Sequence, residues 1–285
     1  MPATSGGRER ASNLYGTASV LKNLVPTLAA YAAVPLVADR SAVAAACLAP
    51  LLGLLLYRLT IVMHDCGHAT LFRSRKINDA VGLLLGAVTG ISFRRFRARH
   101  WEHHRNYGHE RDPQGFHYRG LAQMTKGELL RHLLAPLLGV NLRYVFAESY
   151  LHPANLARAS TGELVALATA QLALAALVTG LGRHPLAVLL PAVSAVTFGL
   201  FFSQLRGIAE HGARDGTDPR GFVRSHARDW LGALLLYDLH FNLHEEHHNQ
   251  PQVPSCVLAA LARARRDSAY ASRPTMWHTL RGMLR

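Results

Sequence analysis

Three short segments of the sequence place histidines at the spacing of an α-helix. In two of them the spacing is i, i+3, i+4, which puts three imidazoles on one side of a helix. A chain with 17 histidines would contain only about 0.06 such triplets by chance, so two copies argue against coincidence. The histidines are His64 and His68 in the first segment, His100, His103 and His104 in the second, and His244, His247 and His248 in the third.

Grouped imidazoles are typical ligands of transition-metal ions, and these segments supply more of them than one ion needs. A structural zinc ion takes about four protein ligands and a catalytic one about three, whereas two ions of higher coordination number can use about eight or nine nitrogens. His211 is a candidate ninth ligand, with a lone interfacial histidine as the alternative interpretation. The spacing therefore predicts a site for two metal ions.

Four apolar stretches are long enough, or nearly so, to cross a bilayer as helices. A hydrocarbon core of about 30 Å requires roughly 20 helical residues. Asp39 and Arg40 suit a short turn after the first stretch, and Gly182 and Pro185 suit a turn after the third. The sequence therefore predicts an all-α membrane protein with two transmembrane hairpins. The four stretches are residues 21–37, 43–63, 164–181 and 186–205.

Two further stretches are predicted to form helices that do not span the bilayer, the first a core, re-entrant or interfacial helix and the second an interfacial one. Residues 80–93 are apolar but too few to span a bilayer, and residues 129–151 carry enough charge to be amphipathic. We expect residues 1–285 to form a single domain. Its predicted parts are an N-terminal tail (1–18), the first hairpin (19–63), a segment with the first two histidine groups (64–161), the second hairpin (162–205) and a segment with the third group (206–285).

The basic residues predict the orientation of the chain in the membrane. With two hairpins, both termini and all histidine groups fall on one side, and the short turns on the other side carry only Arg40 and Arg183. The positive-inside rule makes the histidine side cytoplasmic, where the groups would lie in a helical cap. We expect no cleavable signal peptide, because residues 6–15 are polar.

The composition narrows the choice of partners. Apolar residues make up 49% of the chain and charged residues 17%, a balance that favours a membrane protein. A net charge of +13 is explained by a basic face beside anionic headgroups, so we expect a lipid bilayer and no nucleic acid as partner. The three cysteines are too few and too widely spaced for a disulfide framework or a cysteine-based zinc site.

The motifs together resemble those of the membrane fatty acid desaturase superfamily, whose three histidine boxes hold two non-haem iron ions. Residues 64–68, 100–104 and 244–248 match the three boxes in order, and Asp112 followed by Pro113 and Asn242 match their usual surroundings. The resemblance covers about residues 57–254. It implies two iron ions, dioxygen as co-substrate, and electrons from an external ferredoxin, rubredoxin or cytochrome with its reductase.

One position departs from the family pattern. Some members have an asparagine four residues before the isolated histidine, where this chain has Gly207. Four acidic residues near the predicted ligands are candidates for accepting a hydrogen bond from the ring nitrogen that faces away from the metal. They are Asp65, Glu102, Glu210 and Glu246.

The other histidines are not expected to be ligands. His109 and His240 lie near the boxes but outside the matching spacing. Six more are predicted at the surface or the membrane interface, namely His117, His132, His152, His184, His226 and His278.

The resemblance implies a desaturase that inserts a C=C bond into an acyl chain or a similar aliphatic substrate. A hydroxylase of the same superfamily, or a desaturase of a small polar metabolite such as an amino acid, is the alternative. A different class also fits one motif, because His244, Glu245 and His248 satisfy the H-E-x-x-H pattern of zinc hydrolases.

Overall fold

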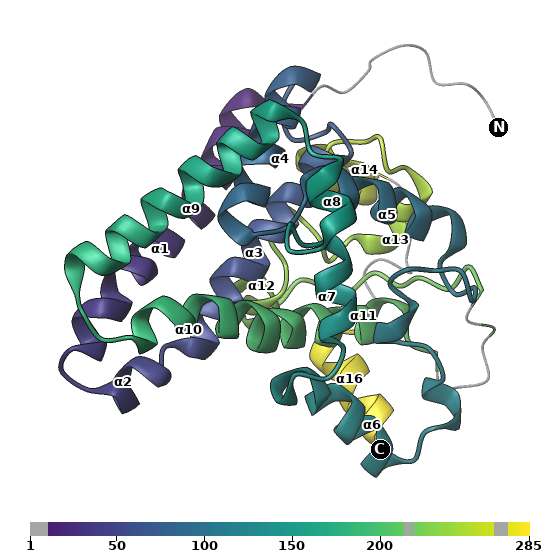
Figure 1. Cartoon of the computed structure of the whole chain (residues 1–285). Helices are drawn as coiled ribbons and strands as arrows, with labels where there is room; N and C mark the ends of the chain where they lie inside the picture. Colours follow the sequence, from purple (N-terminus) through teal and green to yellow (C-terminus); the bar gives the residue numbers. More distant parts are fainter. Residues whose placement is uncertain (1–10, 214–217, 219, 265–272) are drawn as a thin grey trace.

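The structure is a computed structural model that describes residues 11–213, 218, 220–264 and 273–285. Within these residues the chain is helical and forms no strand, only two isolated bridges. Figure 1 shows α1 and α9 side by side at one end of the molecule, with α5 and α13 at the other. The helices are α1 (Asn13–Ala38), α2 (Ala42–Ala46), α3 (Ala49–Gly67), α4 (Arg75–Thr89), α5 (Phe93–Asn106), α6 (Lys126–Leu134), α7 (Leu142–Glu148), α8 (Pro153–Ala157), α9 (Thr161–Leu181), α10 (Leu186–Ser194), α11 (Leu200–His211), α12 (Trp230–Leu235), α13 (His244–Asn249), α14 (Ser255–Ala264) and α16 (Met276–Leu284).

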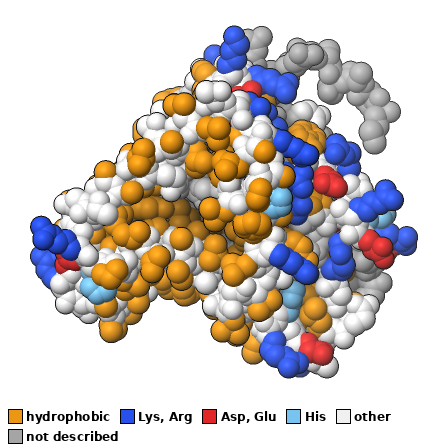
Figure 2. Space-filling model, in the orientation of Figure 1, with side chains coloured by type: hydrophobic (Ala, Val, Ile, Leu, Met, Phe, Trp, Pro, Cys, Tyr) orange, Lys and Arg blue, Asp and Glu red, His pale blue; other side chains and the backbone are white. Residues whose placement is uncertain are grey.

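Four helical runs are long and apolar enough to cross a membrane, which confirms the prediction of four such segments. They are Asn13–Ala38, Ala42–Gly67, Thr161–Leu181 and Leu186–His211. The last run joins α10 and α11 through a π-helical turn, η4 (Ala195–Gly199). In the face shown in Figure 2, hydrophobic side chains cover the part built by α1, α9 and α10, and most Lys and Arg side chains lie over the rest.

The first helix begins earlier than the apolar pattern indicated. The Ser12 side chain accepts a hydrogen bond from the backbone N–H of Tyr15 at 3.3 Å, and this cap starts α1 at Asn13. The helix therefore extends into residues that were assigned to the N-terminal tail. A side-chain cap satisfies N–H groups that have no partner within the helix, so it can begin a helix before the apolar stretch does.

The turns that follow α1 and α9 are tied together. The Asp39 carboxylate accepts hydrogen bonds from the backbone N–H groups of Arg183 at 3.0 Å and His184 at 2.8 Å. Gly182 lies directly against Pro35, where an added Cβ would come within 2.7 Å of the Pro35 carbonyl oxygen. The absence of a side chain at position 182 thus lets the two turns meet.

The two shorter apolar stretches fold as several helices rather than as one each. Gly90 adopts a left-handed conformation (φ 75°) that ends α4, and Ser92 caps the start of α5. The stretch 129–151 is divided between α6, the 3-10 turn η3 (Ala135–Leu138) and α7. Pro136 lies at the start of η3 and Gly139 has φ 74°, so both residues favour the break.

A buried polar network joins the first two long helices to the segment before α13. The Arg58 guanidinium on α3 lies 2.9 Å from the Asp238 carboxylate and 2.9 Å from the side-chain oxygen of Asn23 on α1. Asn23 also donates to Asp238 at 2.6 Å, and Lys22 pairs with the other carboxylate oxygen at 2.9 Å. Arg58 and Asp238 are both buried, and among the described residues Asp238 is the carboxylate that pairs with the Arg58 charge.

Replacing Asp238 with alanine is expected to lower the free energy of unfolding by about 3–5 kcal/mol, because it leaves the Arg58 charge buried without a counter-ion. The control is Lys22→Ala, which removes a side chain that is 58% exposed from the same carboxylate and should cost less than about 1 kcal/mol. Unfolding of the detergent-purified variants, followed by circular dichroism, measures both changes. Equal losses in the two variants would contradict this assignment.

Candidate metal centre

Four helices bring histidines to one end of the long helices. α3 ends with His64 in its last turn and His68 as its C-cap, and α11 ends with His211. α5 and α13 each carry a triplet at the i, i+3, i+4 spacing. All nine histidines predicted as ligands lie in two clusters, and within each cluster the candidate ligand atoms lie within 4.8 Å of one another.

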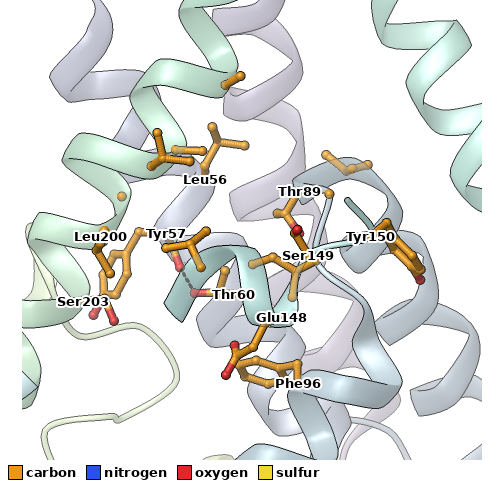
Figure 3. A pocket seen from close by; sticks show the side chains of 18 of the residues that line it. Leu56, Tyr57, Thr60, Thr89, Phe96, Glu148, Ser149, Tyr150, Leu200 and Ser203 are labelled. Carbon is orange, nitrogen blue, oxygen red and sulfur yellow. Dashed lines mark hydrogen bonds between the residues drawn. The ribbon is translucent and has the colours of Figure 1, made fainter. Parts of the chain in front are cut away.

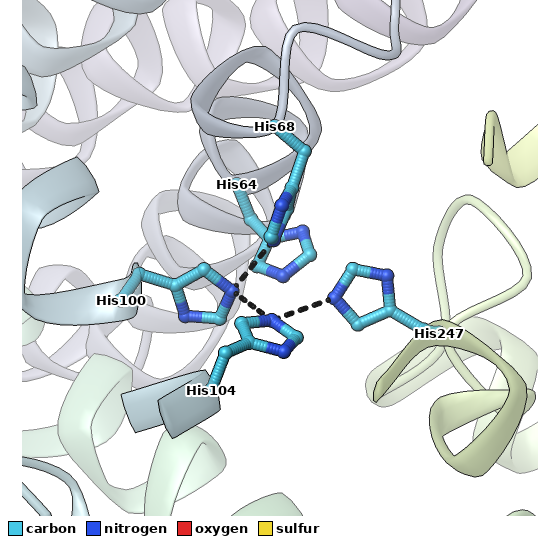
Figure 4. Close-up of side chains that lie close together, drawn as sticks. All are labelled: His64, His68, His100, His104 and His247. Atoms are coloured by element: carbon cyan, nitrogen blue, oxygen red, sulfur yellow. Dashed lines mark hydrogen bonds between the residues drawn. The ribbon is translucent and has the colours of Figure 1, made fainter. Parts of the chain in front are cut away.

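The first cluster contains five imidazoles whose nitrogens converge on one small volume (Figure 4). The Nε2 atom of His100 lies 2.8 Å from that of His68 and 3.0 Å from that of His104, and the His104 atom lies 3.1 Å from the Nε2 of His247. The Nε2 of His64 is buried without a hydrogen-bond partner in the described part of the chain. The five members are His64, His68, His100, His104 and His247.

The second cluster contains four buried imidazoles, those of His103, His211, His244 and His248. The Nε2 atom of His244 lies 2.9 Å from that of His211 and 3.1 Å from that of His248. The two clusters adjoin, because the ring centroids of His104 in the first and His248 in the second are 4.3 Å apart.

Burial lowers the pKa values of several of these imidazoles and so favours their neutral form. It lowers the pKa of His68 to about 3, with a further contribution from the charge of Arg97, and that of His104 to about 2, where protonation would also be opposed by any charge on the histidines around it. The pKa values of His100 and His244 fall well below 6.5 for the same reasons. Neutral imidazoles with convergent lone pairs are the form that binds metal ions, so the donor set fits two transition-metal ions.

Two aspartates hold imidazole rings from the side that faces away from the clusters. The Asp65 carboxylate lies 3.0 Å from Nδ1 of its neighbour His64. The Asp112 carboxylate lies 2.9 and 3.1 Å from Nδ1 of His103 and also accepts the Tyr118 hydroxyl. Burial raises the pKa of Asp112, but these hydrogen bonds outweigh it, so this pKa lies below its usual value. A carboxylate at Nδ1 leaves Nε2 free to bind a metal ion.

Asp65 was among the residues predicted for this role, whereas Asp112 was not. Asp112 stands nine residues after His103, in a loop, so no helical spacing indicates the contact. Its only signal was the Asp112–Pro113 pair that resembles family members.

The three glutamates named with Asp65 have different surroundings. Glu246 accepts from the Ser225 hydroxyl at 2.5 Å and from Arg273 at 2.6 Å. Glu102 lines a separate charged pocket on α5, and in the described part of the chain no hydrogen bond joins its carboxylate to a clustered histidine. The Oε2 atom of Glu210 lies 3.3 Å from the Nε2 of His244. This carboxylate therefore meets the ring at the nitrogen that faces the cluster and not at Nδ1.

Two of the histidines predicted at the surface or the membrane interface are buried in the protein. His117 is 7% exposed and packs its ring against Gly207 on α11, and His226 is fully buried. The backbone of His226 bonds to Asn242, its N–H to the carbonyl at 2.8 Å and its carbonyl to the side-chain amide at 3.0 Å. His117 ends the short 3-10 helix η1 (Gly115–His117) and His226 lies in a loop, and neither setting gives a periodic signal. Neither belongs to a cluster, and neither do His109 and His240.

A cavity of about 980 Å³ extends from the clusters between the long helices. His64, His100, His211 and His244 line one end of it. Figure 3 shows it from close by. Leu56, Tyr57 and Thr60 of α3 line it together with Leu200 and Ser203 of α11, and Thr89, Phe96 and Glu148 lie across from them. Most of the lining side chains are apolar, so the cavity suits a hydrophobic ligand that extends to the histidines.

Comparison with known proteins gives one family. A sequence model of the fatty acid desaturase family matches residues 41–280. An omega-3 fatty acid desaturase, chloroplastic, of Glycine max is 26% identical over 238 residues, which are 74% of this chain and 52% of that protein. The sn-2 acyl-lipid omega-3 desaturase (ferredoxin), chloroplastic, of Arabidopsis thaliana is 32% identical over 65 residues, 23% of this chain and 15% of that protein. The chain spans about half the length of the first relative and less of the second.

Replacing His64 with alanine is expected to weaken the binding of one of the two transition-metal ions by about tenfold or more, and so to lower the metal content, because it removes one donor from the five-histidine cluster. The control is His226→Ala, which removes an imidazole that is just as buried but lies outside both clusters. Elemental analysis of the purified variants after loading with ferrous iron provides the measurement. Retention of both ions by His64→Ala, or an equal loss in His226→Ala, would count against the site.

Proposed function

The chain belongs to the fatty acid desaturase family, and we propose that it is a membrane oxidoreductase that uses dioxygen and two iron ions to insert a C=C bond into an acyl chain. One observation carries this proposal. Nine histidines from distant parts of the sequence converge in two adjoining clusters at the end of a large, mainly apolar cavity. This arrangement would bring an aliphatic chain beside two metal ions.

We propose that each cluster holds one iron ion, the first with five imidazole ligands and the second with four. No protein side chain oxidises an unactivated C–H bond, so bound iron would supply that capacity together with dioxygen. Asp65 and Asp112 would fix the rings of His64 and His103 through their Nδ1 atoms. The cavity walls would hold the acyl chain in place and exclude water from the reacting carbons.

The reaction needs a source of electrons. Formation of one double bond with reduction of dioxygen to two water molecules consumes two further electrons and two protons. The printed name of the Arabidopsis thaliana relative includes ferredoxin. This supports an external carrier of the ferredoxin class for the present chain, and a rubredoxin or a cytochrome with its reductase would serve the same purpose.

We propose that the four long runs form two transmembrane hairpins of a single domain, with both termini and a histidine-bearing helical cap in the cytoplasm. The contact of Asp39 with Arg183 and His184 supports this topology, since it puts the two connecting turns at the same end. These turns contain two basic residues, Arg40 and Arg183, and this low number supports a non-cytoplasmic location for them.

The cavity favours an acyl chain over a small polar metabolite, because its volume is larger than an amino acid would fill and its lining is mainly apolar.

A zinc hydrolase is less compatible with the surroundings of Glu245. Its side chain is 45% exposed and lies 3.6 Å from Arg273, so it is not directed at the cluster as a general base would have to be. Hydroxylation by the same two ions would replace one hydrogen by a hydroxyl group, whereas desaturation removes one hydrogen from each of two adjacent carbons.

The test of the proposal is the product formed from phospholipid acyl chains in nanodiscs supplied with iron, ferredoxin, its reductase and NADPH. A loss of two mass units is expected for desaturation, whereas a gain of sixteen would indicate hydroxylation. Replacing His103 with alanine should abolish turnover while the protein still inserts, because it removes a donor from the second cluster. An iron-independent hydrolytic product, or full activity of His103→Ala, would refute the proposal.

Access along the cavity can be tested separately from the clusters. Thr60 lines the cavity one helical turn before His64, so Thr60→Trp should obstruct the path of an acyl chain. We expect a loss of turnover of about tenfold or more, with iron content unchanged. Thr60→Ser keeps the cavity open and is the control. Unchanged turnover in Thr60→Trp would show that the substrate does not pass this point.

A further inference from the structure

The two clusters differ in their number of histidines, and a carboxylate lies beside the smaller one. Oε2 of Glu210 is 3.3 Å from Nε2 of His244. That nitrogen is the same one that lies 2.9 Å from Nε2 of His211 and 3.1 Å from Nε2 of His248. The Glu210 carboxylate therefore meets His244 at the nitrogen directed into the cluster. A residue that only oriented the ring would contact Nδ1 instead, as Asp112 does at His103.

One oxygen of Glu210 is anchored and the other is not. The Nε atom of Arg206, one helical turn earlier on α11, pairs with Oε2 at 3.2 Å. The Oε1 atom is buried and has no hydrogen-bond partner among the described residues. Glu210 is only 1% exposed, so water does not reach its carboxylate freely. A buried carboxylate oxygen that receives no hydrogen bond is unfavourable unless a cation binds to it.

The position that supplies a polar side chain in some family members cannot do so here. Position 207 is glycine, and a Cβ added there would lie 2.9 Å from Cβ and 3.1 Å from Cγ of His117. The His117 side chain thus occupies the space that an asparagine at position 207 would need. Three residues further along the same helix, Glu210 reaches the cluster from the end of α11.

We propose that Glu210 is an oxygen ligand of the iron ion at the four-histidine cluster, and this inference rests on the proposed di-iron function. Imidazole and carboxylate together form a common ligand set for non-haem iron. With Glu210 the second ion has five protein ligands, one of them anionic, while the first has five neutral ones. The two ions then differ in charge environment although both lie among histidines.

The test compares iron content and spectra of the full-length protein with those of Glu210→Gln, which keeps the size of the side chain but removes its charge. We expect Glu210→Gln to hold the second ion at least about tenfold more weakly and to retain the first. The matched control is Glu148→Gln. Glu148 lines the same cavity and pairs with Arg99 at 2.7 Å rather than with a histidine, so both ions should remain.

Mössbauer spectra of the 57Fe-loaded proteins give a second readout that does not depend on turnover. The parent protein should show two distinct ferrous sites, and Glu210→Gln should lose or shift only one. Glu210→His replaces one donor by another and should recover the second ion with altered parameters, which a residue acting only through Arg206 would not do. Circular dichroism establishes that each variant is folded.

Three results are distinguishable. Selective loss of one site in Glu210→Gln, with recovery in Glu210→His, supports the assignment. Two unaltered sites in Glu210→Gln would overturn it and leave the di-iron function intact. A parent protein that never binds two iron ions would overturn both.

Discussion

The helical periodicity of α5 is the constraint on which both histidine clusters depend. His100 and His104 are one turn apart and enter the first cluster, while His103, rotated by about 100° from His104, enters the second. One helix therefore contributes to both clusters, and they must lie next to each other beside it. The ends of α3 and α11 and the short α13 complete them from other directions. Residues from distant parts of the sequence can meet in this way only if these four helix ends are fixed relative to one another.

Buried polar contacts, as well as apolar packing, hold the histidine-bearing helices in position relative to one another. Arg58 lies in the middle of an apolar helix and is stabilised by Asp238, six residues before His244. This network joins α3, which carries the first histidines, to the segment that leads into the third group. The same principle operates nearer the clusters, where Asp112 joins the loop after α5 to His103. In both places a buried carboxylate joins segments that are separate in the sequence.

Periodic features could be predicted from the sequence, and features that depend on loops could not. The histidine triplets and the four long helical runs follow from spacing and apolar length alone. The contact of Asp112, the burial of His117 and His226, and the division of residues 129–151 depend on how irregular segments fold back. Proximity in sequence was also a poor guide for carboxylates, since Asp65 contacts its neighbour whereas Glu102 and Glu246 turn away.

The helix α9 forms one wall of the cavity, and most of its surface is not covered by protein. Cavity-lining residues such as Leu164, Ala168 and Ala175 recur along it at helical spacing. Only 17% of its most apolar 18-residue stretch is buried inside the protein. The wall is therefore a single helix, about 10 Å across. In a bilayer, lipid tails on its outer side would be separated from the cavity by this one layer. A cavity that reaches the histidines would thus have only one helix between its interior and the hydrocarbon phase.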